Sequence, residues 1–180
     1  MRESIVHSLE PIFDRDSKIL ILGTMPSPKS RESGFYYGHP QNRFWRVLAA
    51  VFCEAVPETH SDKKDFLRRH HIALWDVLKS CDIRGAQDSS IRNPKVNDLQ
   101  RVLSCANIRR IYTTGMRATA LYQRYCAAET GMPAVYLPSP SAANGARFTF
   151  SDLVEAYQII TKEIEMDEKH HDTAERHRTE

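Results

Sequence analysis

Four short apolar runs, separated by stretches with helical periodicity, constrain the fold of this chain more than any other feature of its sequence. The runs are 18–22 (KILIL), 72–77 (IALWDV), 108–113 (IRRIYT) and 134–137 (AVYL). Short apolar runs of this kind are typical of strands that are buried on both faces. Strands that alternate with helices form βαβ crossovers and a parallel sheet. The sequence therefore predicts an α/β fold in which helices cover both faces of a parallel sheet.

Helical spacing marks the segments between these runs. Five apolar residues between positions 44 and 52 recur at i, i+3, i+4, i+7 and i+8, which places them on one face of a helix. Ser61 is expected to cap a short helix, and a capping box of Thr149 and Asp152 predicts the start of the last one. The apolar residues that mark the expected helices are Phe44, Val47, Leu48, Val51 and Phe52; Phe66 and Leu67; Val96, Leu99 and Leu103; Ala118, Leu121, Tyr122 and Tyr125; and Leu153, Tyr157, Ile160 and Ile164.

The length and composition fit one globular domain. The chain has 180 residues, of which 41% are hydrophobic and 27% charged, so it can bury a core of ordinary size. We expect a domain over residues 1–165 and a charged, disordered tail over residues 166–180. No apolar run approaches the roughly 20 residues of a membrane helix, and the first residues do not resemble a signal peptide. We therefore expect a cytoplasmic monomer with no membrane partner, associated with the nucleoid if the protein is bacterial.

The cysteines do not form a metal-binding pattern. Cys53, Cys81, Cys105 and Cys126 are separated by 28, 24 and 21 residues, without any CxxC pair. This spacing excludes a zinc ribbon, and we expect ordinary buried thiols and no metal site. The histidines of the tail are expected to be solvated.

Basic residues are concentrated in the body of the chain. The formal net charge is +2, but residues 161–180 carry −3, so residues 1–160 carry +5. The segment 84–110 holds six Arg and Lys side chains against Asp88 and Asp98. A modest basic surface permits nucleic-acid binding without requiring it, because a solvated charged face has the same composition.

Three loops that follow predicted strands carry most of the residues suited to chemistry, and ligands of parallel α/β sheets bind at such strand ends. The first loop, 23–30 (GTMPSPKS), has neither the GK[ST] of a P-loop nor a GxGxxG fingerprint. The second, 35–45 (FYYGHPQNRFW), combines aromatic rings with amides, which suits a nucleobase that stacks on a ring and is read along its edge. The third, 137–145 (LPSPSAANG), can press against a sugar–phosphate backbone, although a proline-rich turn is the simpler explanation when it is considered alone.

At these loops the chain resembles the uracil-DNA glycosylase superfamily, and within it the hypoxanthine-DNA (deoxyinosine) glycosylase branch. The resemblance lies in ILGTMPSPKS, YYGHPQNRFW and LPSPSAAN, with further similarity at ALWDVL and DSSI, and it spans residues 16–165. It implies a three-layer α/β/α sandwich around a four-stranded parallel sheet in a single domain. It also implies a monofunctional DNA glycosylase of base excision repair without metal or redox cofactor. The implied partner is DNA that contains a deaminated base, above all hypoxanthine.

The resemblance also assigns the catalytic residue, and the three loops supply the residues expected to bind the base and the DNA. The mismatch-specific relatives carry a water-positioning Asn where this chain has Met25, whereas in the hypoxanthine branch that role belongs to an Asn that falls on Asn42. Asn42 is therefore the expected catalytic residue, and it would orient a water beneath C1′, because a neutral amide is a poor general base. The residues expected to bind the base or the DNA are Met25, Pro26, Ser27, Tyr37, His39, Phe44, Ser139, Ser141 and Asn144, with Tyr37 or Phe44 as the stacking ring and Lys29 and Arg43 as phosphate contacts.

Four alternatives remain open on the sequence. The preferred base could be uracil or another deaminated base. The domain could bind damaged or mismatched DNA without catalysis, since Met25 replaces an Asn of the relatives. Asp76 or Asp88 could supply a catalytic carboxylate, although structural capping is the simpler role. A small-molecule nucleotide hydrolase is disfavoured because the chain has no metal-ligand cluster or phosphate loop.

Overall fold

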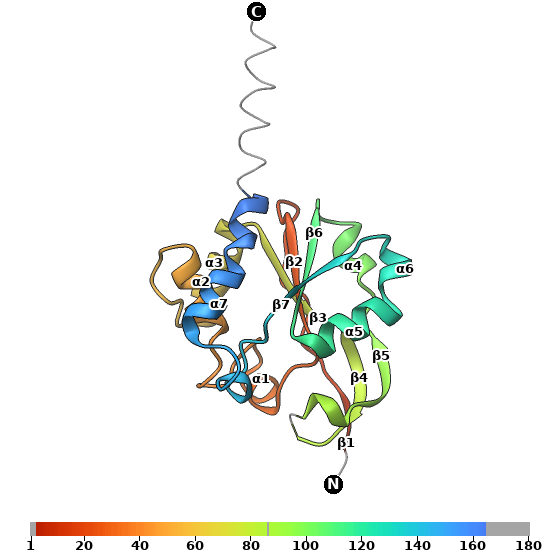
Figure 1. Ribbon diagram of the computed structural model, residues 1–180. Coiled ribbons are helices and arrows are strands. Elements are labelled where there is room, and N and C mark those ends of the chain that lie inside the picture. The colour runs from red at the N-terminus through yellow and green to blue at the C-terminus, as the bar shows by residue number, and fades with distance from the viewer. Residues whose placement is uncertain (1–2, 86, 165–180) are drawn as a thin grey trace, which may run out of the picture.

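A four-stranded parallel sheet forms the centre of the molecule. The computed structural model describes residues 3–85 and 87–164 (Figure 1), and the tail predicted over residues 166–180 lies outside them. The strands of the sheet are β2 (Ile19–Gly23), β3 (Ile72–Asp76), β6 (Arg110–Thr114) and β7 (Ala134–Leu137), in the order β3-β2-β6-β7. All three pairings are parallel, so the four predicted strands and their orientation are confirmed.

Helices cover both faces of this sheet, as predicted (Figure 1). One layer consists of α2 (Phe44–Val51), α3 (His60–Arg69) and α7 (Phe150–Tyr157), and the other of α4 (Gln100–Leu103), α5 (Met116–Tyr125) and α6 (Ala127–Thr130). All five residues of β2 and of β3 are buried, because these neighbouring strands are covered on both sides. Among the described residues, no helix is long and apolar enough to span a bilayer.

The helix starts show which capping signals matter. The box of Thr149 and Asp152 is confirmed at the start of α7, where each side chain accepts a hydrogen bond from the other residue's backbone N–H. The cap predicted at Ser61 is wrong, because Thr59 and Asp62 form the same reciprocal box two residues earlier. A reciprocal box satisfies two backbone donors at once, whereas Ser61 alone would satisfy one.

A second, antiparallel sheet was not predicted from the sequence. It consists of β1 (Glu3–Val6), β4 (Leu78–Ile83) and β5 (Arg92–Val96), in the order β1-β4-β5, with the short helix η1 (Asp88–Ser90) between β4 and β5. The helix predicted from Val96 is therefore wrong at its start: Val96 ends β5, and only Gln100–Leu103 are helical. Exposed polar residues dominate β5, so its apolar pattern is too weak to indicate a strand.

The four cysteines are all free thiols, but they differ in exposure. Cys81 and Cys126 are buried, as predicted. Cys53 and Cys105 are exposed, so the prediction of buried thiols is wrong for them.

The strand order creates a crevice at the carboxyl edge of the parallel sheet. The chain passes from β2 to β3 on one side and then crosses over to β6 on the other side of β2. Connections that leave a central strand in opposite directions open a crevice at the strand ends, which is where open α/β sheets bind ligands. The short helix α1 (Pro28–Ser33) and the loop with helix η2 (Ala142–Asn144) follow β2 and β7 directly at this edge.

Candidate active site

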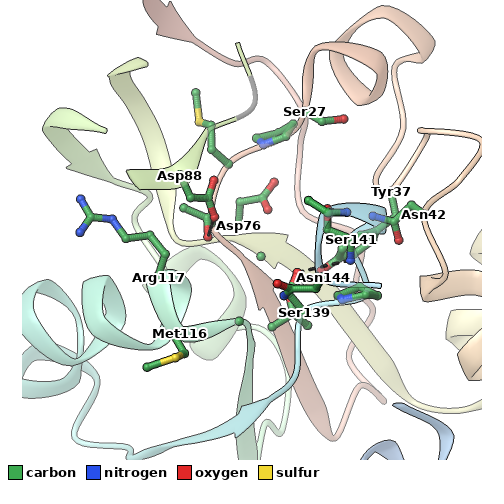
Figure 2. Close-up of a pocket in the computed structure, with 18 of the residues that line it drawn as sticks. Ser27, Tyr37, Asn42, Asp76, Asp88, Met116, Arg117, Ser139, Ser141 and Asn144 are labelled. Carbon is green, nitrogen blue, oxygen red and sulfur yellow. Dashed lines mark hydrogen bonds between the residues drawn. The ribbon is translucent and has the colours of Figure 1, made fainter. Parts of the chain in front are cut away.

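One cavity of about 580 Å³ occupies this crevice. All four strands of the parallel sheet contribute to its lining, through Gly23 of β2, Asp76 of β3, Thr114 of β6 and Tyr136 of β7. Figure 2 shows Asp76 and Asp88 beside each other, with Tyr37, Asn42 and the third loop on one side and Met116 and Arg117 on the other. The site therefore draws on segments far apart in the sequence, and the topology of the sheet brings them together.

The floor of the cavity depends on the glycine that ends β2. Gly23 pairs with Asp76 in the parallel ladder between β2 and β3. A Cβ at position 23 would lie 2.4 Å from Asp76 Oδ1 and 3.3 Å from the hydroxyl oxygen of Tyr37. That Tyr37 hydroxyl is also hydrogen-bonded to Thr114 Oγ1 at 3.0 Å. The missing side chain at Gly23 thus makes room for a carboxyl group and a phenol at the bottom of the crevice.

Asp76 is the most unusual polar residue of the cavity. The residue is 4% exposed, and its buried Oδ2 forms no hydrogen bond with a described residue. Burial, together with the nearby negative charge of Asp88, raises the pKa of Asp76 to about 8. Burial also raises the pKa of Asp88, although Asp88 Oδ2 accepts a hydrogen bond from the Thr24 hydroxyl at 3.0 Å. A capping role, the simpler reading of the sequence, does not explain an oxygen without a partner.

The aromatic wall consists of Tyr37, supported from behind by Phe44. The two rings stack with centroids 3.8 Å apart and planes 12° apart. Phe44 is fully buried and does not line the cavity, so it cannot be the stacking ring for a ligand, and that alternative is corrected. Tyr37 does line the cavity and has a left-handed backbone, with φ +53°, which a bulky residue adopts only when its surroundings hold it there.

Asn42 lies at the edge of the same cavity, where the resemblance placed it. Its Oδ1 accepts a hydrogen bond from the backbone N–H of Phe44 at 2.9 Å, at the start of α2. The amide is therefore held in one orientation, and its Nδ2 hydrogens remain for a ligand. By contrast, His39 is exposed, does not line the cavity, and accepts a hydrogen bond from Gln41 N at 3.1 Å. Asn42 thus lines the cavity and His39 does not, although the sequence analysis expected both in one site.

Arg43 holds the third loop in place. Its backbone N–H and Nε donate to the carbonyl of Pro140, and its Nη1 and Nη2 donate to the carbonyls of Phe148 and Ser141 at 2.6 and 3.2 Å. These contacts correct its assignment as a phosphate contact, because the guanidinium already serves three carbonyls. Lys29 is exposed and pairs with Glu32 at 2.8 Å, outside the cavity lining.

The small polar residues of the first and third loops line the cavity but use their hydroxyls locally. Ser27 caps α1 by accepting from Ser30 N, and Ser141 caps η2 by accepting from Ala143 N. Ser139 Oγ accepts from Ser141 N at 3.3 Å. These bonds stiffen both loops, so that they present fixed surfaces to a ligand. The predicted base- or DNA-binding residues that line the cavity are Met25, Pro26, Ser27, Tyr37, Ser139, Ser141 and Asn144.

The basic segment 84–110 is only partly available to DNA. Arg101 forms an ion pair with Glu10, and Arg110 forms one with Glu163, at sites away from the cavity lining. Arg84, Arg92 and Lys95 are exposed on or next to the small sheet, and Ile83 at the end of β4 and Gly85 in the turn after it line the cavity. Arg117, at the start of α5, also lines the cavity and lies near Asp88, where its positive charge partly offsets the rise that burial causes in the pKa of Asp88. Sequence reasoning missed Arg117, because nothing in its local pattern distinguishes it from a solvated helix residue.

The described residues contain no group of three or more His, Cys, Asp and Glu side chains arranged to hold a metal ion.

A family model for the uracil DNA glycosylase superfamily matches residues 10–161 of this chain. The chain belongs to the uracil DNA glycosylase superfamily. It is accordingly a DNA glycosylase of DNA repair, a hydrolase that acts on N-glycosyl bonds in DNA.

Individual relatives agree with this family membership. A hypoxanthine DNA glycosylase of Methanosarcina acetivorans is 33% identical over 134 residues, which cover 74% of this chain and 84% of the relative. A hypoxanthine DNA glycosylase of Methanosarcina barkeri is 32% identical over 110 residues, or 60% of this chain and 70% of the relative. The solution NMR structure of a candidate uracil DNA glycosylase from Methanosarcina acetivorans has a TM-score of 0.73 and 28% identity, and covers 89% of this chain and 99% of that one.

Proposed function

We propose that this glycosylase hydrolyses the N-glycosidic bond of hypoxanthine in DNA. The observation that carries the proposal is the cavity of about 580 Å³, in which the ring of Tyr37 stands over a floor that holds Asp76 and Thr114. A flipped base needs an aromatic face to stack on and polar groups to read its edge, and the cavity offers both. The names of the two curated relatives favour hypoxanthine over other deaminated bases.

Extrusion of the nucleotide is the first source of selectivity. Hypoxanthine pairs poorly, so extruding it from the duplex costs less than extruding adenine. Tyr37 repays part of this cost by stacking, and Phe44 keeps the Tyr37 ring fixed from behind. The third loop, clamped by Arg43, presses on the strand through Ser139, Ser141 and Asn144 and holds it distorted.

Asn42 orients the attacking water. Cleavage of the glycosidic bond builds positive charge on the sugar, so a water placed beneath C1′ adds readily. The amide of Asn42 cannot take a proton near pH 7, but it can hold the water or the sugar in a fixed position. Because Phe44 N–H fixes Oδ1, the two Nδ2 hydrogens are directed by the fold. The backbone N–H groups of Met25 and Ser27 can stabilise charge on the departing base, whereas Pro26 has no N–H to donate.

The test is an excision panel under single-turnover conditions with excess enzyme. The duplexes carry one hypoxanthine, uracil, xanthine or mismatched thymine, and abasic product is revealed by alkaline cleavage. We expect the hypoxanthine duplex to be cut fastest. Faster cutting of the uracil duplex would transfer the proposal to uracil, and tight binding without abasic product would identify a damaged-DNA-binding domain instead.

A further inference from the structure

We propose that Asp76 is the proton donor to the departing base: the proton of its carboxylic acid passes to an acceptor nitrogen of the extruded purine as the C1′–N bond breaks. The inference rests on the proposed function and assigns a second catalytic residue beside Asn42. Asp76 stands at the carboxyl end of β3, in the lining of the same cavity (Figure 2).

The first support is the unsatisfied oxygen. A buried polar atom without a partner costs free energy, so structures retain one mainly where it serves a function. Asp76 Oδ2 has no hydrogen-bond partner among the described residues, although the residue is only 4% exposed. The fold also reserves space for this carboxyl group, since any Cβ at Gly23 would collide with its Oδ1. Because the protein supplies no partner for this carboxyl oxygen, the acid proton remains available to a base with an acceptor nitrogen in the cavity.

The second support is the set of charged and titratable groups around the carboxyl. Asp88 faces it from η1 with a negative charge, and Arg117 of α5 acts on Asp88. Tyr36 and Tyr37 face it from the second loop, and burial raises the pKa of both phenols, so they stay neutral. Burial, and after it the negative charge of Asp88, raise the pKa of Asp76 to about 8, so the acid form predominates at pH 7.

The step balances without any further reactant. The C1′–N bond breaks and its electron pair moves to the purine ring. The Asp76 proton goes to a ring nitrogen, so the purine leaves as a neutral molecule and Asp76 becomes a carboxylate. The water held by Asn42 forms the new C1′–O bond and releases a proton to solvent, from which Asp76 is protonated again. A positioned proton donor contributes about 10²–10⁴-fold to such reactions.

The experiment compares wild type with Asp76→Asn, an isosteric change that removes the proton. We expect Asp76→Asn to slow single-turnover excision of hypoxanthine by about 100-fold or more, whereas Asp65→Asn, on α3 and outside the cavity lining, leaves it unchanged. The wild-type rate should fall as pH rises through about 8. Asp88→Asn should move this fall to lower pH, because it removes the neighbouring negative charge. A wild-type rate that rises through the same pH range, as expected for a carboxylate base, would overturn the inference, as would an unimpaired Asp76→Asn.

A second readout does not depend on activity. NMR of protein labelled with ¹³C at the aspartate carboxyl carbons should show one signal that titrates near pH 8 and is missing in Asp76→Asn. If every aspartate titrates at ordinary values, the donor assignment fails while the proposed function stands. If wild type releases no base from any duplex, the proposed function fails, and the titration still reports the state of Asp76.

Discussion

Asn42 and Asp76 line one cavity, but they differ in hydrogen bonding within the protein: Asn42 Oδ1 has a partner and Asp76 Oδ2 has none among the described residues. The backbone N–H of Phe44 holds Asn42 Oδ1, so the amide is an oriented part of the loop that precedes α2. Asp76 Oδ2 has no described partner, although it is buried. A satisfied polar group can position a reactant, whereas an unsatisfied one keeps its hydrogen-bonding capacity for the ligand. The site thus combines a fixed carboxamide with a carboxyl group whose partner is missing.

The largest effect is expected for Asn42, where two variants separate the local bond to Phe44 N–H from the contacts of the Nδ2 hydrogens with the substrate. Asn42→Ala removes both the Phe44 bond and the Nδ2 hydrogens, while Asn42→Asp keeps an oxygen for Phe44 N–H and loses the hydrogens. Both variants should lose about 100-fold or more in single-turnover excision. Only Asn42→Ala should also lose about 1 kcal/mol of stability, measured by thermal unfolding, because it alone loses the local bond.

Gln41→Ala is the matched control for this pair. Gln41 is exposed on the same loop and does not line the cavity, so excision and stability should stay as in wild type. Turnover at the wild-type rate in Asn42→Ala would refute the assignment of Asn42.

Gly23→Ala tests the position of the Asp76 carboxyl group. The new methyl group would lie 2.4 Å from Asp76 Oδ1, so the carboxyl group must move. We expect at least about a tenfold loss of excision and a stability loss of about 1–3 kcal/mol.

Gly131→Ala tests whether lost stability alone explains a slower Gly23→Ala enzyme. Gly131 ends α6 with φ +66° and has open space around it, so Ala should cost about 1 kcal/mol through backbone strain and leave excision unchanged. Equal losses of excision in the two variants would show that Gly23 has no special place in the site.

The pH dependence of the free energy of unfolding tests the raised pKa of Asp76 in the absence of substrate. The pKa of Asp76 is raised in the folded state, so the unfolded chain releases this proton at lower pH than the native protein does. Ionisation of the unfolded chain therefore lowers the free energy of unfolding of wild type; this loss is absent below about pH 4 and grows as pH rises to about 8. Asp76→Asn removes it, so the stability of the variant relative to wild type should increase over this range by up to a few kcal/mol. Urea unfolding at several pH values measures the difference, and a difference that is constant with pH would contradict the raised pKa.

The smallest effect belongs to the phenol of Tyr37. Tyr37→Phe keeps the ring that stacks on Phe44 and removes the hydrogen bond to Thr114 Oγ1. We expect a stability loss of about 1 kcal/mol in thermal unfolding and no more than a few-fold loss of excision. A loss as large as that of Asn42→Ala would mean that the hydroxyl, rather than the ring, acts on the substrate.

The parallel sheet could be predicted because each buried strand has a recognisable apolar run in its own sequence, as at 18–22 and 72–77. The sequence analysis missed the small antiparallel sheet, whose β5 is mostly exposed and polar. Within the site, Asn42, which the resemblance singled out, lines the cavity, and its catalytic role stays a prediction. The sequence could not decide between Tyr37 and Phe44, because only packing shows which ring faces the cavity. It also could not single out Asp76, since burial and the lack of a partner are properties of the folded molecule.

The most direct test of the account is the single-turnover rate of hypoxanthine release by wild type from about pH 6 to about pH 10. We expect release of free base, with a rate that is highest at low and neutral pH and falls through about pH 8 as Asp76 loses its proton. No release at any pH would contradict the proposed function. A rate that rises through pH 8 would contradict the role of Asp76.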